Sequence, residues 1–142
     1  MAPSCFGIQP FTVKVITKPE HLAALPAICY GQAQVGQATA VLVFVAKKDA
    51  AAEGARFIEL KQLKQYAPPY AGMIEGFLAG VKGAGKNASW CERQAYLALG
   101  FALAAAAEHR VASCPMEGFD GAAGKHARVQ RHARPLRPQL RP

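Results

Sequence analysis

Residues 80–86 carry the most recognisable chemical pattern, because G-V-K-G-A-G-K matches most of the G-x-x-x-x-G-K signature of a phosphate-binding loop. Such a loop follows a buried strand, opens a helix and places Ser or Thr after the lysine to bind magnesium. Here a helical pattern precedes the segment, and Asn87 stands at the hydroxyl position. We therefore interpret residues 80–86 as a flexible, glycine-rich connection between two helices.

The thiol and imidazole side chains show no catalytic or metal-binding spacing. Cys5, Cys29, Cys91 and Cys114 form neither a C-x-x-C pair nor a cluster with histidine. The N-terminal ten residues lack a charged start followed by an apolar run, so no secretory signal is predicted. We interpret the cysteines as scattered buried thiols of a cytoplasmic protein, and the histidines at 21 and 109 as surface residues.

The net charge of +8 is concentrated at one end of the chain. Residues 121–142 contain six lysines and arginines, three closely spaced prolines and no acidic residue, whereas the first 120 residues carry 11 basic and 9 acidic side chains. The sequence predicts a domain over residues 1–120 and a basic, Pro/Arg-rich disordered tail over residues 121–142. Specific nucleic-acid binding is not predicted, because aromatic residues do not interleave the basic ones.

Hydrophobic patterning predicts an α+β domain. Residues 11–17 are rich in β-branched side chains, which favours a strand, and residues 41–46 (V-L-V-F-V-A) are typical of a buried strand. Residues 19–28 predict a short helix with proline in its first turn. Residues 50–81 predict a mostly helical region broken near Pro68, and residues 111–114 another short strand.

The strongest local signal is a long apolar helix. Ser89 and Glu92 have the spacing of a capping box, which predicts a helix that begins at Ser89 and runs to about His109. Between residues 95 and 107 the hydroxyl of Tyr96 is the only polar side-chain group. This apolar stretch is too short for a bilayer core, which needs about 20 residues. We expect a central helix covered on most sides by its own domain or by a partner subunit.

Two loops remain without a role on composition alone. Residues 3–11 read P-S-C-F-G-I-Q-P-F and lead into the first strand, and residues 115–120 read P-M-E-G-F-D and follow the last. Gly118 would allow another group to approach the backbone closely. Both segments indicate ordered turns, and neither by itself indicates a reaction.

Taken in order, four segments resemble motifs of the FMN-dependent nitroreductase family. Residues 3–11 resemble its P-S-S-x-x-x-Q-P-W segment, and residues 30–39 (Y-G-Q-A-Q-V-G-Q-A-T) resemble its N-Q-x-Q-x-x-x-A-S motif. Residues 90–97 (W-C-E-R-Q-A-Y-L) are similar to the start of its central helix, and residues 115–120 to its P-x-E-G-F-D flavin loop. The matches keep the family order and cover about residues 2–120.

The resemblance implies a nitroreductase-like mixed β-sheet flanked by helices, incomplete in this chain, with a long central apolar helix. It implies a homodimer with FMN at each subunit interface. It also implies ping-pong hydride transfer, in which NAD(P)H reduces the flavin and the flavin reduces a nitroaromatic, a quinone or a similar acceptor. The flavin would supply the chemistry while the protein positions it.

The resemblance also assigns roles to individual residues. Glu117 and Gly118 match residues whose backbone N–H groups face the flavin ring, and Pro115 would lie against the ring. Ser4 matches a loop that reaches FMN across the dimer. Gly31, Gln32 and Gln34 fall where the family reads the pyrimidine edge and the nicotinamide side. The complete candidate cofactor-binding set is Pro3, Ser4, Cys5, Gly31, Gln32, Gln34, Pro115, Met116, Glu117 and Gly118.

Several departures from the family pattern accompany the resemblance. Cys5 replaces the second serine, Phe11 replaces tryptophan, and Gly31 stands where many members have asparagine. The family's Arg/Ser-rich opening segment, which grips the FMN phosphate, and its C-terminal strand are not recognisable here. Because a dianionic phosphate needs positioned donors, we expect the printed chain to bind FMN weakly or not at all. The alternative hypothesis is a catalytically inactive fragment that acts as a dimerising or binding module.

Overall fold

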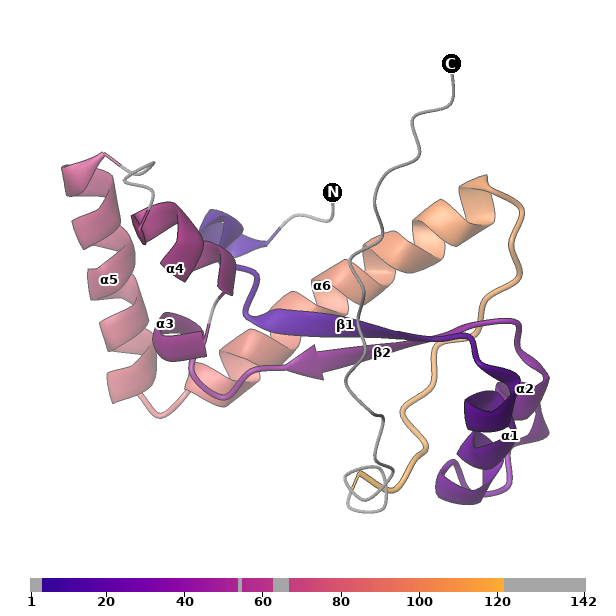
Figure 1. Ribbon diagram of the computed structural model, residues 1–142. Helices are drawn as coiled ribbons and strands as arrows, with labels where there is room; N and C mark the ends of the chain where they lie inside the picture. Colours follow the sequence, from indigo (N-terminus) through magenta and orange to yellow (C-terminus); the bar gives the residue numbers. More distant parts are fainter. Residues whose placement is uncertain (1–3, 54, 63–66, 122–142) are drawn as a thin grey trace.

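The computed structural model describes residues 4–53, 55–62 and 67–121. In chain order its elements are η1 (Cys5–Gly7), β1 (Phe11–Ile16), α1 (Pro19–Ile28), α2 (Ala33–Gln37), β2 (Val41–Ala46), α3 (Ala50–Glu53), α4 (Ala55–Gln62), α5 (Pro68–Gly83) and α6 (Asn87–Glu108). A long hairpin-like ribbon of β1 and β2 crosses α6, with α3, α4 and α5 at one end and α1 and α2 at the other (Figure 1). The predicted α+β class is confirmed.

The two strands pair antiparallel, with Phe11 opposite Ala46 and Ile16 opposite Val41. Both strands lie where the sequence predicts them, and both contact α6. The expectation of a buried second strand is wrong, because Leu42 and Val45 are exposed by 47% and 37%. The physical reason is that each strand has a single strand partner within the described ranges, so a large part of β2 faces solvent.

The hydrophobic core lies at the α3–α5 end of the ribbon. Ile8 from the opening loop, Phe57 from α4, and Ile74 and Leu78 from α5 pack with Trp90 and Cys91 at the start of α6. Phe77 meets Trp90 edge to face, with ring centroids 5.8 Å apart. The core therefore fixes the opening loop and the first turns of α6 against the helices.

The helix α6 begins two residues before the predicted capping box. Its first residue is Asn87, and the Ser89 hydroxyl donates to the Lys86 carbonyl instead of accepting from a backbone N–H. The reason lies in the preceding turn, where α5 continues through Gly83 and only Gly85, with φ of +67°, breaks the path before α6 starts. The predicted loop over residues 80–86 is therefore helical in its first four residues.

Residues 111–114 form no strand with the described residues, so the strand predicted there is wrong. The chain leaves α6 through Arg110, whose φ of 56° is left-handed, and the Val111 N–H donates to the Ala106 carbonyl at 2.8 Å. This geometry turns the chain back along α6 instead of presenting it to the sheet.

The apolar stretch of α6 is covered on one side only. Ala95 and Ala98 are buried, but Leu97 and Phe101 are exposed by 48% and 52%, so the expected cover is not supplied by the described part of this chain. None of the described helices combines the length and apolar character needed to cross a bilayer. The predicted tail lies outside the described residues, apart from Gly121.

Candidate cofactor site

The loop over residues 115–118 is tied to the 30–34 segment of the same chain. The Gln32 side-chain amide donates to the Gly118 carbonyl at 2.9 Å, and the Gln34 amide donates to the Gln32 carboxamide oxygen at 3.2 Å. The Asp120 N–H donates to the Ile28 carbonyl at 2.8 Å, at the end of α1. Two segments that the sequence assigned to one site therefore lie side by side.

A tight turn after α1 brings Gln32 to this position. Tyr30 and Gly31 have φ of 51° and 75°, and the Gly31 N–H donates back to the Pro26 carbonyl at 2.8 Å. This is the six-residue closure typical of a left-handed helix end. A side chain at residue 31 would be strained in that conformation, so the glycine serves the turn.

The structure identifies the group that approaches Gly118, which the sequence did not reveal. A Cβ at this residue would lie 2.9 Å from Gln32 Nε2 and 3.8 Å from Tyr30 Cδ2. The absence of a side chain therefore lets Gln32 approach the loop backbone. The predicted role, in which Gly118 leaves room for a ligand, stays a prediction.

The backbone N–H groups of Glu117 and Gly118 are available as donors. No hydrogen bond within the described part of the chain uses either group, although the neighbouring Phe119 and Asp120 N–H groups are both paired. Free, ordered N–H groups in a fixed loop can bind an anionic or carbonyl oxygen. Their predicted role toward a flavin ring stays a prediction.

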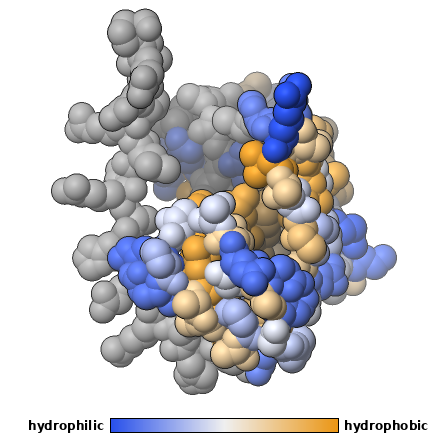
Figure 2. Space-filling model, turned by 90° about the vertical axis from the view of Figure 1, so that its right-hand side faces the viewer, coloured by the Kyte–Doolittle hydropathy of each residue, from blue (hydrophilic) through white to orange (hydrophobic). Residues whose placement is uncertain are grey.

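A groove of about 430 Å³ separates this loop from α6. Its walls are predominantly apolar, and the lining residues are Tyr96, Leu99, Gly100, Leu103, Pro115, Met116 and Glu117. A second hollow of about 680 Å³ shares Tyr96 and Gly100 and continues along α6 past Leu97 and Phe101. Figure 2 shows apolar surface gathered in the middle of one face between hydrophilic rims.

One polar contact joins the two walls of the groove. The Tyr96 hydroxyl donates to the Glu117 carboxylate, and this hydrogen bond, with partial burial and the negative charge of Glu117, raises the pKa of Tyr96. The hydroxyl is therefore protonated throughout the physiological range and acts as a donor.

The opening loop lies on the opposite flank of α6. The Cys5 N–H donates to the side-chain oxygen of Gln94 at 2.8 Å, and Gln94 is 5% exposed. Residues 94 and 96 are about 200° apart around a helix with 3.6 residues per turn. Gln94 therefore holds the opening loop on one flank, and Tyr96 holds the 115–118 loop on another.

The opening loop has a closed structure of its own. The Ser4 hydroxyl oxygen accepts from the Gln9 N–H at 3.1 Å, and a 3₁₀ turn follows with Phe6 at φ of 54°. Pro3 lies outside the described residues. The structure therefore does not bring Ser4 and Cys5 into the groove that Pro115, Met116 and Glu117 line in the same chain.

Comparison with known proteins identifies the family of this chain. The sequence profile described as the Nitroreductase family matches residues 1–134. This chain belongs to the nitroreductase family. The match includes residues 121–134 of the basic segment, so the boundary at residue 120 stays a prediction.

Relatives of this nitroreductase-family chain include two bacterial proteins of similar identity. A Bacillus subtilis protein assigned as an NAD(P)H nitroreductase is 31% identical over 135 residues, which cover 84% of this chain and 59% of that protein. A Thermus thermophilus NADH dehydrogenase is 32% identical over 130 residues, 84% of this chain and 58% of its own length. The chain thus spans less than two thirds of the relatives it matches.

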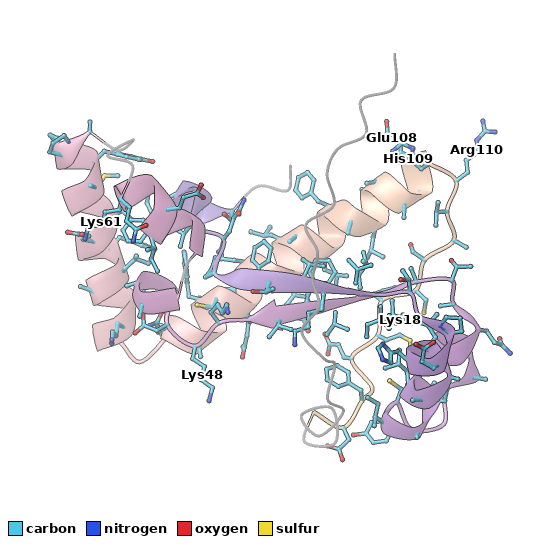
Figure 3. The ribbon with its side chains drawn as sticks, in the orientation of Figure 1. Lys18, Lys48, Lys61, Glu108, His109 and Arg110 are labelled. Carbon is cyan, nitrogen blue, oxygen red and sulfur yellow. The ribbon has the colours of Figure 1, made fainter. Side chains whose placement is uncertain are left out.

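The charged end of α6 in this family member points away from the groove. Figure 3 shows Glu108, His109 and Arg110 at the end of α6 farthest from α5, directed outward. The prediction of a surface position is confirmed for His109, whereas His21 is half-buried.

Of the thiols, Cys91 is buried and Cys114 is exposed, and burial raises the pKa of the half-buried Cys29. The expectation of uniformly buried thiols is therefore wrong for Cys114.

Proposed function

We propose that this chain is a flavin-dependent oxidoreductase that binds FMN in the groove between α6 and residues 115–118. With NAD(P)H as co-substrate, it would reduce a nitroaromatic, a quinone or a similar acceptor by hydride transfer. The observation that carries the proposal is the pair of free N–H groups at Glu117 and Gly118, fixed beside an apolar groove. Family membership and the relatives' names support the same reaction class.

The chemistry of the groove fits the ring of a flavin. Its volume falls in the usual range of about 300–1,000 Å³ for small-molecule sites, and Pro115, Met116 and Leu103 supply apolar walls. Bound FMN would supply a ring that accepts and donates hydride. The protein's own contribution is to present the two N–H donors to the ring edge and to exclude water with the apolar walls.

The chemistry of the groove does not by itself fit the FMN phosphate. None of its lining residues is basic, whereas a phosphate dianion calls for positioned cationic or N–H donors. Donors must therefore come from another segment or from another subunit. The expectation that this chain binds FMN weakly or not at all follows from this shortage.

The proposed homodimer follows from the positions of the opening loop and the 115–118 loop on different flanks of α6. If the opening loop and the 115–118 loop both contact one FMN, α6 of a single chain stands between them. A second copy can present its opening loop to the groove of the first. The exposed Leu97 and Phe101 beside that groove supply apolar surface for such a contact.

An FMN titration of the purified chain tests the proposal. Binding is expected to quench flavin fluorescence and to raise the melting temperature, by a stabilisation of about 2.7 kcal/mol when FMN is at 100 times its Kd. Riboflavin separates the ring from the phosphate, and it should bind nearly as well because the groove lacks basic residues. Absence of both effects with both ligands would contradict the proposal for this chain.

The exposed apolar surface along α6 favours a second candidate, a binding module that dimerises without catalysis. Sedimentation velocity with and without FMN separates the two. A colourless dimer whose mass and stability do not change when FMN is added would support the binding module. A dimer that binds FMN would support the oxidoreductase.

A further inference from the structure

Tyr96 carries the single polar side-chain group in the apolar stretch between residues 95 and 107. The side chain is 54% exposed, so the hydroxyl could be hydrated by solvent. Instead it donates to the Glu117 carboxylate, on a loop 21 residues further along the chain. Within the residues that the structure describes, this contact is the one polar link between α6 and the loop that bears the free N–H donors.

The loop is held at two places close to those donors. Tyr96 holds the side chain of Glu117, and Gln32 holds the carbonyl of Gly118. The Gly118 N–H lies between these two anchors along the backbone, and the Glu117 N–H directly precedes the first of them. Loss of either anchor would free the peptide plane that carries one donor to rotate, because a loop backbone without hydrogen bonds samples many conformations.

We propose that Tyr96 is a positioning residue for the cofactor, acting through Glu117. Its hydroxyl draws the Glu117 carboxylate to the α6 side of the groove. That placement turns the Glu117 and Gly118 N–H groups toward the ligand and keeps the carboxylate charge bonded to a donor. This inference rests on the proposed function, and it assigns the hydroxyl a role that packing of the ring does not require.

The variant Tyr96→Phe isolates the hydroxyl, because phenylalanine keeps the ring that lines both hollows. Tyr70→Phe is the matched control, because it removes the same hydroxyl from a 42% exposed tyrosine on α5 that lines neither hollow. We expect Tyr96→Phe to weaken FMN binding about five- to tenfold and Tyr70→Phe to leave it unchanged.

A double-mutant cycle between Tyr96 and Glu117 distinguishes positioning of the loop from a general structural effect of the substitution. Glu117→Gln keeps an acceptor for the hydroxyl and should retain FMN affinity within about threefold, whereas Glu117→Leu should match Tyr96→Phe. In the Glu117→Leu background, Tyr96→Phe should cause no further loss. Equal losses for Gln and Leu, or full additivity of Tyr96→Phe with Glu117→Leu, would overturn the proposal.

A readout without flavin tests the contact itself. In the chain without FMN, the phenol titration is followed by ultraviolet absorbance, and subtracting the curve of Tyr96→Phe from that of the wild type isolates the titration of Tyr96. Introducing Glu117→Leu in both backgrounds should lower the pKa of Tyr96. An unchanged pKa would overturn the proposal at its first step. A lowered pKa with unchanged FMN affinity would overturn the positioning role while leaving the proposed function intact. Failure of wild type to bind FMN would overturn both.

Discussion

The side-chain amide of Gln32 and the carbonyl of Gly118 are joined at 2.9 Å across 86 residues of sequence. The Gly118 Cα faces the same amide, so a methyl group there would meet Nε2 at 2.9 Å. The Gln32 hydrogen bond therefore depends on the absence of a side chain at Gly118, whether or not a ligand is bound. The relationship fixes the 115–118 loop against the end of α1.

Gly118→Ala should displace the Gln32 side chain and remove its hydrogen bond to the loop. Because that side chain can rotate away, the cost is about 1 kcal/mol, the usual net value of one hydrogen bond. We expect a correspondingly lower urea midpoint and weaker FMN binding. The effect on both should disappear when Gln32 is already alanine, and persistence in that background would contradict the explanation.

Gly72→Ala provides the opposite control. Gly72 lies in α5, and a Cβ there would meet nothing within 4 Å. Alanine in a helix is favoured over glycine by roughly 0.5–1 kcal/mol, so this variant should be more stable than wild type by chemical denaturation. A destabilised Gly72→Ala would show that α5 packs differently from the structure.

Asp49 predicts a pH dependence of stability. Its carboxylate accepts from the Ala51 and Ala52 N–H groups at the start of α3, and Lys82 bonds to it at 2.7 Å. The hydrogen bond from Lys82, followed by that from Ala52, lowers the pKa of Asp49 to about 2 from 3.8. The folded pKa is depressed, so the stabilisation is complete above about pH 4 and is lost as pH falls toward 2.

Asp49→Ala should therefore lower stability at pH 7 by about 1 kcal/mol, the usual cost of losing a helix N-cap. The difference in melting temperature from wild type should shrink as pH decreases below 4. Glu92→Gln is a matched control, because Glu92 is exposed and has no ion pair among the described residues. If the melting temperatures of the wild type and Asp49→Ala differ by the same amount down to pH 2, the lowered pKa of Asp49 does not contribute to stability and the explanation is contradicted.

The core offers a direct comparison between neighbours on α5. Ile74 is fully buried, whereas Met73 is 51% exposed. Ile74→Ala should cost about 2–5 kcal/mol through lost burial and a residual cavity, and Met73→Ala should cost less than about 0.5 kcal/mol. Denaturant unfolding measures both, and similar losses for the two variants would contradict the packing of α5.

The sequence predicted the elements whose patterns are local. Residues 19–28 and 41–46 match α1 and β2 in full, because a first-turn proline and a β-branched run specify backbone conformation directly. It failed at the start of α6, where a capping box at Ser89 competed with a turn set by Gly85. It failed also at residues 111–114, because a strand needs a partner that local sequence does not reveal.

The candidate site was predictable in part through resemblance. Motif order placed the 30–34 segment and residues 115–118 in one site, and the Gln32–Gly118 bond agrees with that grouping. The Tyr96–Glu117 contact was not predictable from periodicity, which marks an apolar helix as core and says nothing of which loop returns to it. The lone hydroxyl among apolar residues was the available signal.

The central claim, that the Glu117 and Gly118 N–H groups bind the cofactor, is tested most directly by an amide spectrum. In a ¹H–¹⁵N titration with FMN, we predict that the resonances of these two amides shift together and saturate at the Kd measured by fluorescence. The Gly72 amide, far away on α5, should stay in place. FMN binding that leaves the Glu117 and Gly118 resonances unmoved would contradict the account.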